Sequence, residues 1–289
     1  MCRRLAEDPR VDDLAPDLSW DLPLRLLAGL HYLVLGGEAS WDDVGDALDR
    51  HGEFLATWMV EQDVQTNEVQ RSWALLPAFL SVWDGRPLDL LELGSSAGLN
   101  LVWDRYRFAY ASGAWGAGDL ELRGDDRIPL PAELLGREVT VVRRRGIDLN
   151  PVDVTSDRGA RLLRSFIWAD QPARLERLDR AIEIARNEPP QLMEGDYVEA
   201  LPSLLRNRRE GALLVVFQTA STMYIDRAGA DRVRAAFHDA ARDEPLVYVT
   251  AGRAADDDGF SLEVVRYPSG VAERLAVFDF HGEWLDWGR

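Results

Sequence analysis

The sequence predicts an α/β protein whose sheet has parallel strands and a C-terminal antiparallel hairpin, preceded by a helical N-terminal region. From residue 88 onward, short apolar runs typical of buried strands alternate with helical stretches, which favours a parallel sheet covered by helices. A glycine-rich turn follows the first of these runs. The last two strand-like runs, 261–267 and 273–280, flank the turn sequence Pro268-Ser269-Gly270, which predicts a hairpin.

The first 86 residues are predicted to be helical. Residues 22–33 place apolar side chains at helical spacing and end before two glycines, which stop helices. Residues 42–59 predict a second helix, and a third follows Asn67, with a kink expected at Pro77. We expect this region, 1–86, to act as a lid on an α/β core formed by 87–289.

The core is predicted to begin with a buried strand at 88–93, which breaks at a glycine. Its other strands are expected at 139–148, 193–196, 212–217 and 246–250. Helices are expected at 97–105, 157–166, 172–187 and 227–241. The long segment 106–138 is interpreted as an insertion, and its aromatic, glycine-rich start (106–115) predicts a hairpin or loop beside the site.

Charge argues against nucleic acid as a partner. The formal net charge is −17, whereas binding to a phosphate backbone needs clustered Lys and Arg. A short basic run, 143–145, lies inside a predicted strand. We therefore expect a small-molecule substrate.

Cysteine and histidine usage argues against a metal site. The single cysteine is Cys2, and the four histidines show no metal-ligand spacing. No apolar run reaches transmembrane length, and no signal-peptide pattern is present. These observations predict a cytoplasmic, metal-free protein that does not enter a membrane.

A glycine loop at 92–98, with the sequence ELGSSAG, joins the first strand to the next helix. Glycines let a backbone approach a ligand closely, and a helix start offers free N–H groups. The loop resembles the E/D-x-G-x-G-x-G loop of S-adenosylmethionine-dependent methyltransferases, with Ser96 replacing the middle glycine. The resemblance implies a Rossmann-like class I methyltransferase sheet. It also implies that the methionine end of the cofactor is held by Glu92, Gly94, Ser95, Ser96 and Gly98.

Two further acidic residues follow later strands. Asp148 ends the second predicted strand, where a carboxylate can accept hydrogen bonds from ribose hydroxyls. The methyltransferase resemblance implies that Asp196 meets the adenine amino group and that Tyr197 covers the ring. Structural alternatives exist for both acids: Asp148 as a turn residue before Pro151, and Asp196 as the N-cap of the next helix.

The same loop spells G-x-S-x-G, the nucleophile elbow of serine hydrolases, with Ser96 as nucleophile and His238 or His281 as its base. The helical region before the loop argues against this, because a hydrolase places several strands there. The G-x-G-x-x-G pattern of dinucleotide-binding proteins is absent. A tight strand–helix turn without a ligand, and a methyltransferase-like nucleotide-binding protein without catalysis, remain as alternatives.

A polar segment at 65–72, QTNEVQRS, separates two apolar helical stretches. A capping box formed by Asn67 and Gln70 is the structural alternative, but it does not explain the other polar residues. We expect substrate contacts from Gln65, Asn67, Glu68, Arg71, Asp170 and Gln218. No catalytic base is evident, and methyl transfer can proceed mainly through proximity and alignment.

Four ordered segments, QTNEVQRS, LELGSSAGLNL, GIDLNPVD and FIWADQ, resemble an uncharacterised bacterial family known as a domain of unknown function. The resemblance covers nearly the whole chain. It implies a methyltransferase-like fold and no particular substrate. The resulting hypothesis is an S-adenosylmethionine-dependent methyltransferase of a small polar molecule.

Overall fold

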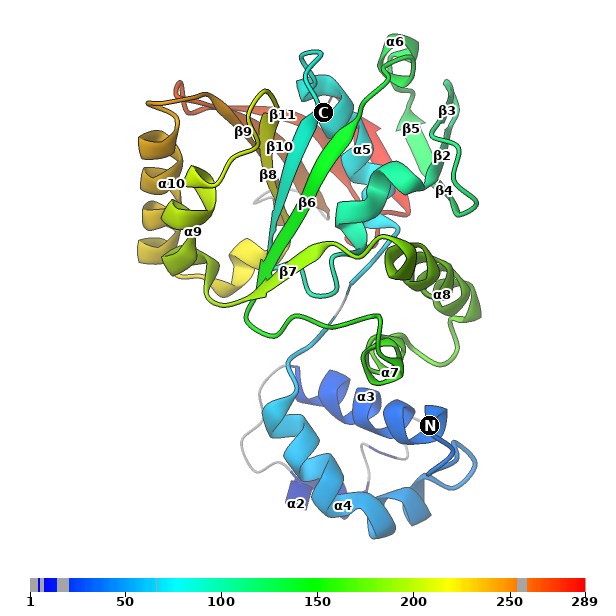
Figure 1. Ribbon diagram of the computed structural model, residues 1–289. Coiled ribbons are helices and arrows are strands. Elements are labelled where there is room, and N and C mark those ends of the chain that lie inside the picture. Colours follow the sequence, from blue (N-terminus) through cyan, green and yellow to red (C-terminus); the bar gives the residue numbers. More distant parts are fainter. Residues whose placement is uncertain (1–4, 6–7, 15–20, 66, 254–258, 289) are drawn as a thin grey trace. The chain divides into compact units, whose positions relative to one another are not determined.

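The structure is a computed structural model that describes residues 5, 8–14, 21–65, 67–253 and 259–288 (Figure 1). The chain forms two compact units. One contains residues 1–66 and 152–182, and the other contains residues 67–151 and 183–289. The predicted boundary at residue 86 marks a change in secondary structure, and the lid role assigned to 1–86 stays a prediction.

The first unit is helical. Its elements are α2 (Pro9–Leu14), α3 (Leu22–Leu35), α4 (Val44–Glu61), α7 (Asp157–Ser165) and most of α8 (Pro172–Asn187). Helix α3 contacts both α4 and α7. Leu30 and Leu33 of α3 pack with Leu48 and Leu55 of α4 in a buried cluster, as the apolar spacing of both segments predicts.

The second unit is built on a sheet in the order β5-β12-β11-β10-β9-β8-β1-β6-β7. The parallel strands are β7 (Gln191–Glu194), β6 (Val141–Asp148), β1 (Leu88–Leu93), β8 (Leu213–Thr219) and β9 (Leu246–Arg253). Antiparallel pairing then joins β9 to β10 (Phe260–Tyr267), β11 (Val271–Phe278) and β12 (Trp284–Trp287), and β5 (Asp125–Ile128) pairs parallel with β12. The prediction of a mixed α/β protein with a large, mostly parallel sheet is confirmed.

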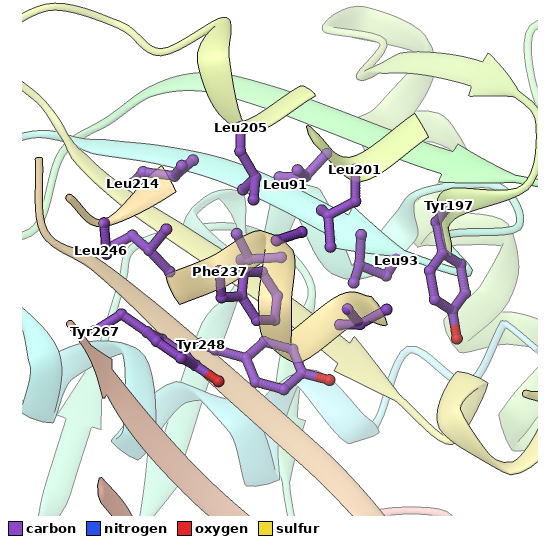
Figure 2. Packing of buried hydrophobic residues seen from close by; sticks show 14 of the residues in the cluster. Leu91, Leu93, Tyr197, Leu201, Leu205, Leu214, Phe237, Leu246, Tyr248 and Tyr267 are labelled. Carbon is purple, nitrogen blue, oxygen red and sulfur yellow. The ribbon is translucent and has the colours of Figure 1, made fainter. Parts of the chain in front are cut away.

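Helices cover both faces of this sheet. On one face, Leu91 and Leu93 of β1 pack against α9 (Tyr197–Arg206) and α10 (Arg227–Ala240), with Leu201 and Phe237 at the centre (Figure 2). On the other face, Phe79 of α5 (Arg71–Val82) meets Phe217 of β8 edge-on, with ring centroids 5.2 Å apart. Side chains alternate along a strand, so these two contacts bury both faces.

The segment between β1 and β6 forms a small second sheet. Its strands are β2 (Arg107–Tyr110), β3 (Gly113–Trp115) and β4 (Glu121–Arg123), and a short helix, α6 (Ala132–Leu135), follows. Strands β2 and β3 are antiparallel neighbours. The hairpin predicted at the start of this insertion is therefore present.

Three details differ from the sequence prediction or extend it. The helix expected at 97–105 is a 3₁₀ segment, η1 (Leu99–Arg105), which begins after Gly98 with φ +69°. Helix α5 continues through Pro77. Strand β12 is only four residues long, and local hydrophobic periodicity does not detect so short a strand.

All three arginines of the basic run 143–145 form ion pairs with acidic side chains. Arg143 and Arg145 both pair with Asp89, which is fully buried on β1. Arg144 pairs with Asp104 and Glu188. The three guanidinium groups are therefore engaged by carboxylates of the same unit, and the expectation about nucleic acid stays a prediction.

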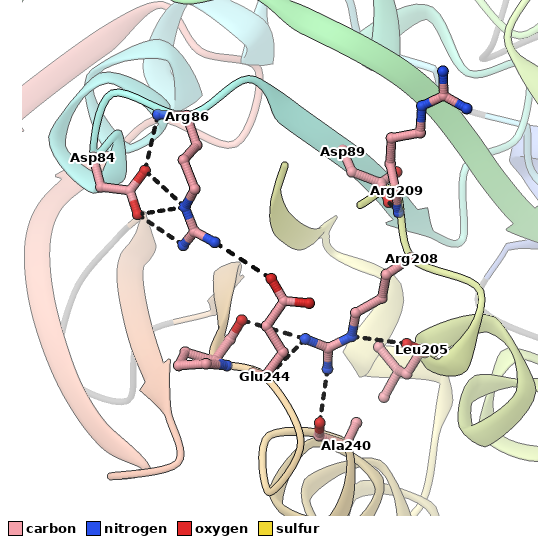
Figure 3. Close-up of polar contacts among 9 residues, drawn as sticks. Asp84, Arg86, Asp89, Leu205, Arg208, Arg209, Ala240 and Glu244 are labelled. Atoms are coloured by element: carbon pink, nitrogen blue, oxygen red, sulfur yellow. Dashed lines mark hydrogen bonds and ion pairs between the residues drawn. The ribbon is translucent and has the colours of Figure 1, made fainter. Parts of the chain in front are cut away.

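Arginines also satisfy backbone carbonyls where α9 and α10 end (Figure 3). Arg208 donates to the carbonyls of Leu205 and Ala240 at 2.9 Å and to that of Glu244 at 2.6 Å. The last carbonyls of a helix lack intrahelical partners. One guanidinium therefore completes the ends of two helices, and burial lowers its pKa.

None of the helices in the described part of the chain combines the length and the apolarity needed to cross a bilayer. Within those same residues, no group of three or more His, Cys, Asp or Glu side chains is arranged to hold a metal ion.

Candidate functional site

The order of the parallel strands reverses at β1. The chain passes from β1 to β6 and β7 on one side, and then returns to β8 on the other side. The loops after β1, β6 and β8 therefore leave the same edge of the sheet, which we call the carboxyl edge. Open parallel sheets bind ligands outside this edge, where the order reverses.

Strained backbone marks two of these loops. Among the residues that the structure describes, the non-glycine positions with positive φ are Ser96 (φ +49°), after β1, and Ala220 (φ +68°), after β8. Left-handed backbone at such residues costs about 1–3 kcal/mol and persists where surrounding contacts hold it. Strain on both sides of the strand-order reversal supports a functional role for this edge.

The start of the glycine loop is tied to β6. The N–H groups of Gly94 and Ser95 donate to the carbonyl of Ile147 at 2.8 and 3.2 Å. The N–H of Ser96 donates to Asp148 Oδ2 at 2.7 Å. Amides expected to face a ligand are therefore already bonded within the protein.

Asn67 holds the second half of the loop. Its side-chain amide donates to the carbonyl of Ser95 at 3.1 Å, and its Oδ1 accepts from the N–H of Leu99 at 3.3 Å. Asn67 therefore bonds to both sides of the loop's second half, while no side-chain cap closes α5, whose N-cap is Gln70. The polar segment at 65–72 and the glycine loop, two separate sequence motifs, meet at this residue.

The loop glycines are required by close packing. A Cβ on Gly94 would lie 2.5 Å from Cβ of Ser221, which belongs to the loop after β8. A Cβ on Gly98 would lie 2.8 Å from Pro190 Cγ and 2.9 Å from Leu192 Cδ2. Both glycines also have φ near +70°, a region that favours glycine.

Gly94→Ala is expected to reduce the free energy of unfolding more than Gly211→Ala. Both glycines have φ above +70°, and this backbone strain alone costs alanine about 1–2 kcal/mol. No atom lies within 4 Å of a Cβ on Gly211, whereas the clash with Ser221 adds about 1–3 kcal/mol at Gly94. Urea unfolding measures both losses, and Ser221→Gly should recover the difference. Equal losses in the two variants would contradict this packing role.

Two polar side-chain atoms of the glycine loop, on Glu92 and Ser95, are buried. Glu92 is 1% exposed, and within the described part of the chain neither its Oε2 nor Ser95 Oγ has a hydrogen-bond partner. Glu92 lies opposite Gly146 in the sheet register, and a Cβ on Gly146 would clash with Ser95 Oγ. The absence of a side chain at Gly146 thus leaves room for Ser95 beside Glu92.

The pKa of Glu92 is raised well above its ordinary value of 4.5, first because burial disfavours the charged form and then because Asp148 is negative. A hydrogen bond with Asn100 and the positive charge of Arg71 act in the opposite direction. Asn100 Oδ1 also accepts from Ser72 Oγ at 2.7 Å. Sequence reasoning missed Ser72 and Asn100, although Asn100 is a polar residue in the apolar run LNLVW.

The acidic residues predicted to bind ribose and adenine have structural roles. Asp148 accepts from the N–H of Ser96 and, through Oδ1, from that of Asn150 at 2.9 Å. Asp196 caps α9 by accepting from the N–H of Val198 at 2.8 Å. Tyr197 packs in the core. The structural alternatives for both acids are therefore present, but each carboxylate oxygen can accept a second hydrogen bond, and the ligand roles stay predictions.

Gln218 holds the carboxyl edge together. Its amide donates to Thr250 Oγ1 at 2.6 Å and to the carbonyl of Ala251 at 3.1 Å, while its Oε1 accepts from Ser221 Oγ at 3.2 Å. This buried side chain therefore links β8, β9 and the loop that packs on Gly94. It positions the site instead of presenting a free amide.

The other predicted substrate contacts lie in different places. Gln65 (buried) and Asp170 (exposed) belong to the first unit, and Thr66 of the same polar segment lies outside the described residues. Glu68 and Arg71 are buried in the second unit and contact the loop after β11.

The position of His238 argues against it as the base in the serine-hydrolase alternative. His238 lies in the last turn of α10, and this helix runs back from the carboxyl edge towards the opposite edge of the sheet. It is therefore badly placed to act as a base for Ser96. Of the two histidines that the sequence proposed for this role, only His281 follows a strand that ends at the carboxyl edge.

Comparison with known proteins places the chain in a family. No curated protein matches the chain. One protein-family model, described as "Uncharacterized protein conserved in bacteria (DUF2332)", matches residues 1–287. The family resemblance expected from four ordered motifs is confirmed, and the chain belongs to this uncharacterized bacterial family.

Proposed function

We propose that this protein binds S-adenosylmethionine at the carboxyl edge of β1 and transfers its methyl group to a small polar molecule. The observation that carries the proposal is a buried oxygen of Glu92 that has no hydrogen-bond partner among the described residues, next to a glycine loop at the strand-order reversal. Strands β7-β6-β1-β8-β9 also follow the first five positions of the 3-2-1-4-5-6 order used by nucleotide-binding sheets. An acid, a glycine loop and this order together favour a nucleoside cofactor.

The residues fit the polar groups of such a cofactor. Glu92 and Ser95 would hold the amino-acid end, because each carries a buried polar atom that lacks a partner within the described residues. Asp148 would accept a ribose hydroxyl with its remaining lone pairs. Asp196, exposed at the start of α9, would accept the adenine amino group. When bound, the cofactor supplies a methyl group activated by a sulfonium centre.

The same fit predicts proton release on binding. A cationic ammonium group beside Glu92 favours the carboxylate over the protonated acid. Burial has raised the pKa of Glu92 in the free protein, so binding would lower that pKa and expel a proton. The buried carboxyl group of Glu92, which ionises on binding, would thus recognise the positive charge of the cofactor's amino-acid end.

Isothermal titration calorimetry with S-adenosylhomocysteine, in two buffers of different ionisation enthalpy, tests this proposal. We expect binding to be accompanied by proton release, and we expect Glu92→Gln to bind without this release. Asp148→Ala should weaken binding about 10-fold or more, which corresponds to about 1.4 kcal/mol. Glu183→Gln, an exposed change on α8, is the matched control. No heat and no thermal shift at millimolar cofactor would reject the proposal.

A second candidate is a nucleoside-binding protein that transfers no methyl group. The internally bonded amides of Gly94, Ser95 and Ser96 favour it, because they hold the loop in shape without a ligand. Incubation with radiolabelled S-adenosylmethionine and a small-molecule extract from bacteria separates the two. Label in low-mass products supports the methyltransferase, and binding without transfer supports the second candidate.

A further inference from the structure

The loop that joins β11 to β12, residues 279–283, reaches the carboxyl edge. Strand β11 is antiparallel to β10, which is antiparallel to β9, so β11 runs in the same direction as the parallel strands. Its following loop therefore leaves the sheet at the same edge as the glycine loop.

The loop is fixed against the start of α5. Arg71 Nε donates to the carbonyl of Phe280 at 2.8 Å, and its guanidinium lies 4.5 Å from the centroid of the Phe280 ring. The side chain of Gln70 donates to the carbonyl of Gly282 at 3.2 Å. A Cβ on Gly282, whose φ is +79°, would lie 2.6 Å from the Gln70 carbonyl oxygen. The backbone on both sides of His281 is thus held.

These contacts place His281 beside a buried carboxylate. Its Nδ1 is buried and lies 3.8 Å from Glu68 Oε2, while the His281 side chain is 41% exposed and that of Glu68 is 4% exposed. Glu68 Oε1 accepts from the N–H of Gln70 at 3.1 Å. One ring nitrogen therefore faces a fixed carboxylate, while part of the His281 side chain is exposed. Such pairs often tighten into a hydrogen bond only when a ligand is bound.

Two residues, Asn67 and Arg71, link Glu68 and His281 to the glycine loop. Asn67, which precedes Glu68, bonds to the carbonyl of Ser95 and to the N–H of Leu99. Arg71, which holds Phe280, acts electrostatically on Glu92. Residues 67–71 of the polar segment thus connect the His281 loop with the residues proposed to hold the cofactor.

We propose that His281, oriented by Glu68, is the proton acceptor of this site, and that the substrate presents a proton-bearing nucleophile, a hydroxyl or an ammonium group. This inference rests on the proposed function. Nε2 of His281 takes the proton from a hydroxyl as it attacks, or from an ammonium group before attack. The lone pair of the resulting oxygen or nitrogen nucleophile forms the bond to the methyl carbon. The carbon–sulfur bond breaks with its electron pair going to sulfur, so the sulfonium becomes a neutral thioether and the imidazole becomes an imidazolium.

Acylation of the full-length protein with diethyl pyrocarbonate tests the pair without any cofactor. Mass spectrometry from pH 5 to 8 gives the titration midpoint of each exposed histidine, with His238 of α10 as an internal reference. Glu68 and Asp279 are the acids that face His281, and Arg71 lies behind Phe280. Glu68→Gln is expected to lower the His281 midpoint by about one pH unit and to leave His238 unchanged. An unchanged His281 midpoint would overturn the pairing.

Methyl transfer from radiolabelled S-adenosylmethionine to the small-molecule extract from bacteria tests the role of His281 as proton acceptor. His281→Asn and Glu68→Gln are expected to reduce the rate about 10²- to 10⁴-fold while the binding heat of S-adenosylhomocysteine is retained. His238→Asn should leave the rate unchanged, and the acidic limb of the pH–rate profile should move to lower pH in Glu68→Gln. Full transfer by His281→Asn would refute this inference and leave the proposed function intact. Absence of binding in the unmodified protein would instead refute the proposed function.

Discussion

Asp89→Asn is expected to destabilise the second unit by about 3–5 kcal/mol, because it removes the charge that compensates the buried Arg145 and the partly buried Arg143. Arg143 Nε donates to Asp89 Oδ1 at 2.9 Å, and Arg145 lies 3.3 Å from Oδ2. The N–H of Arg209 also donates to Oδ2 at 3.0 Å. Burial lowers the pKa of Arg145, and the negative charge of Asp89 acts in the opposite direction. Urea unfolding followed by circular dichroism measures the loss.

Two further variants make this prediction specific. Asp239→Asn removes the acid of an exposed ion pair with Arg242, and we expect little change because exposed pairs contribute little. Arg145→Met should be less destabilising in the Asp89→Asn background than in the unmodified protein. In that background Arg145 is a buried charge without its carboxylate partner, and the change to Met removes it. Additive losses from Asp89→Asn and Arg145→Met would show that the two side chains do not interact energetically.

Glu92→Gln is expected to stabilise the ligand-free protein, and by more as pH rises. The folded-state pKa of Glu92 lies well above its ordinary value of 4.5. Between these two pKa values the folded protein retains a proton that the unfolded chain has lost, so the stability of the unmodified protein falls by about 1.4 kcal/mol per pH unit. The stabilisation from a protonated Glu92 is thus fully present below pH 4.5 and is lost as pH rises through the folded-state pKa.

The measurement compares urea unfolding of both proteins at several pH values between 5 and 8. The stability gap should widen with pH in favour of Glu92→Gln, whereas Glu183→Gln, an exposed change, should leave the stability unaltered. A constant gap would mean that Glu92 titrates alike in both states. Glu92→Gln should also bind S-adenosylhomocysteine more weakly, because the variant lacks the carboxylate proposed to bind the ammonium group. Glu92 would then be a binding residue that lowers the stability of the free protein.

Much of the fold could be predicted from local patterns. The apolar run at 88–93 and the helical spacing at 172–187 correspond to β1 and to α8, whose bounds the structure gives as Leu88–Leu93 and Pro172–Asn187. Helix η1 is the instructive difference. Local spacing predicted an ordinary helix, but Gly98 adopts positive φ and Asn67 takes the first N–H, so the tight 3₁₀ form results.

The candidate site could be predicted only in part. A glycine loop can be recognised in the sequence because its residues are contiguous. Glu92 and Asp148 could also be placed at strand ends. The polar segment at 65–72 was noticed, but its role was not readable, since Asn67 acts on a loop 28 residues away and Glu68 faces His281. The unpartnered state of Glu92 Oε2 within the described residues also depends on what packs around it.

The sequence by itself determined most of the longer elements and the loop that ends β1, because hydrophobic periodicity and glycine conformations are properties of neighbouring residues. The tertiary structure decided which of those elements became neighbours, and therefore which charges were compensated. Gln70 meets Gly282 across 212 positions, and Asp89 meets Arg145 across 56. Such contacts arise from burial and strand order, which bring distant groups out of water together, and no local pattern in the chain encodes them.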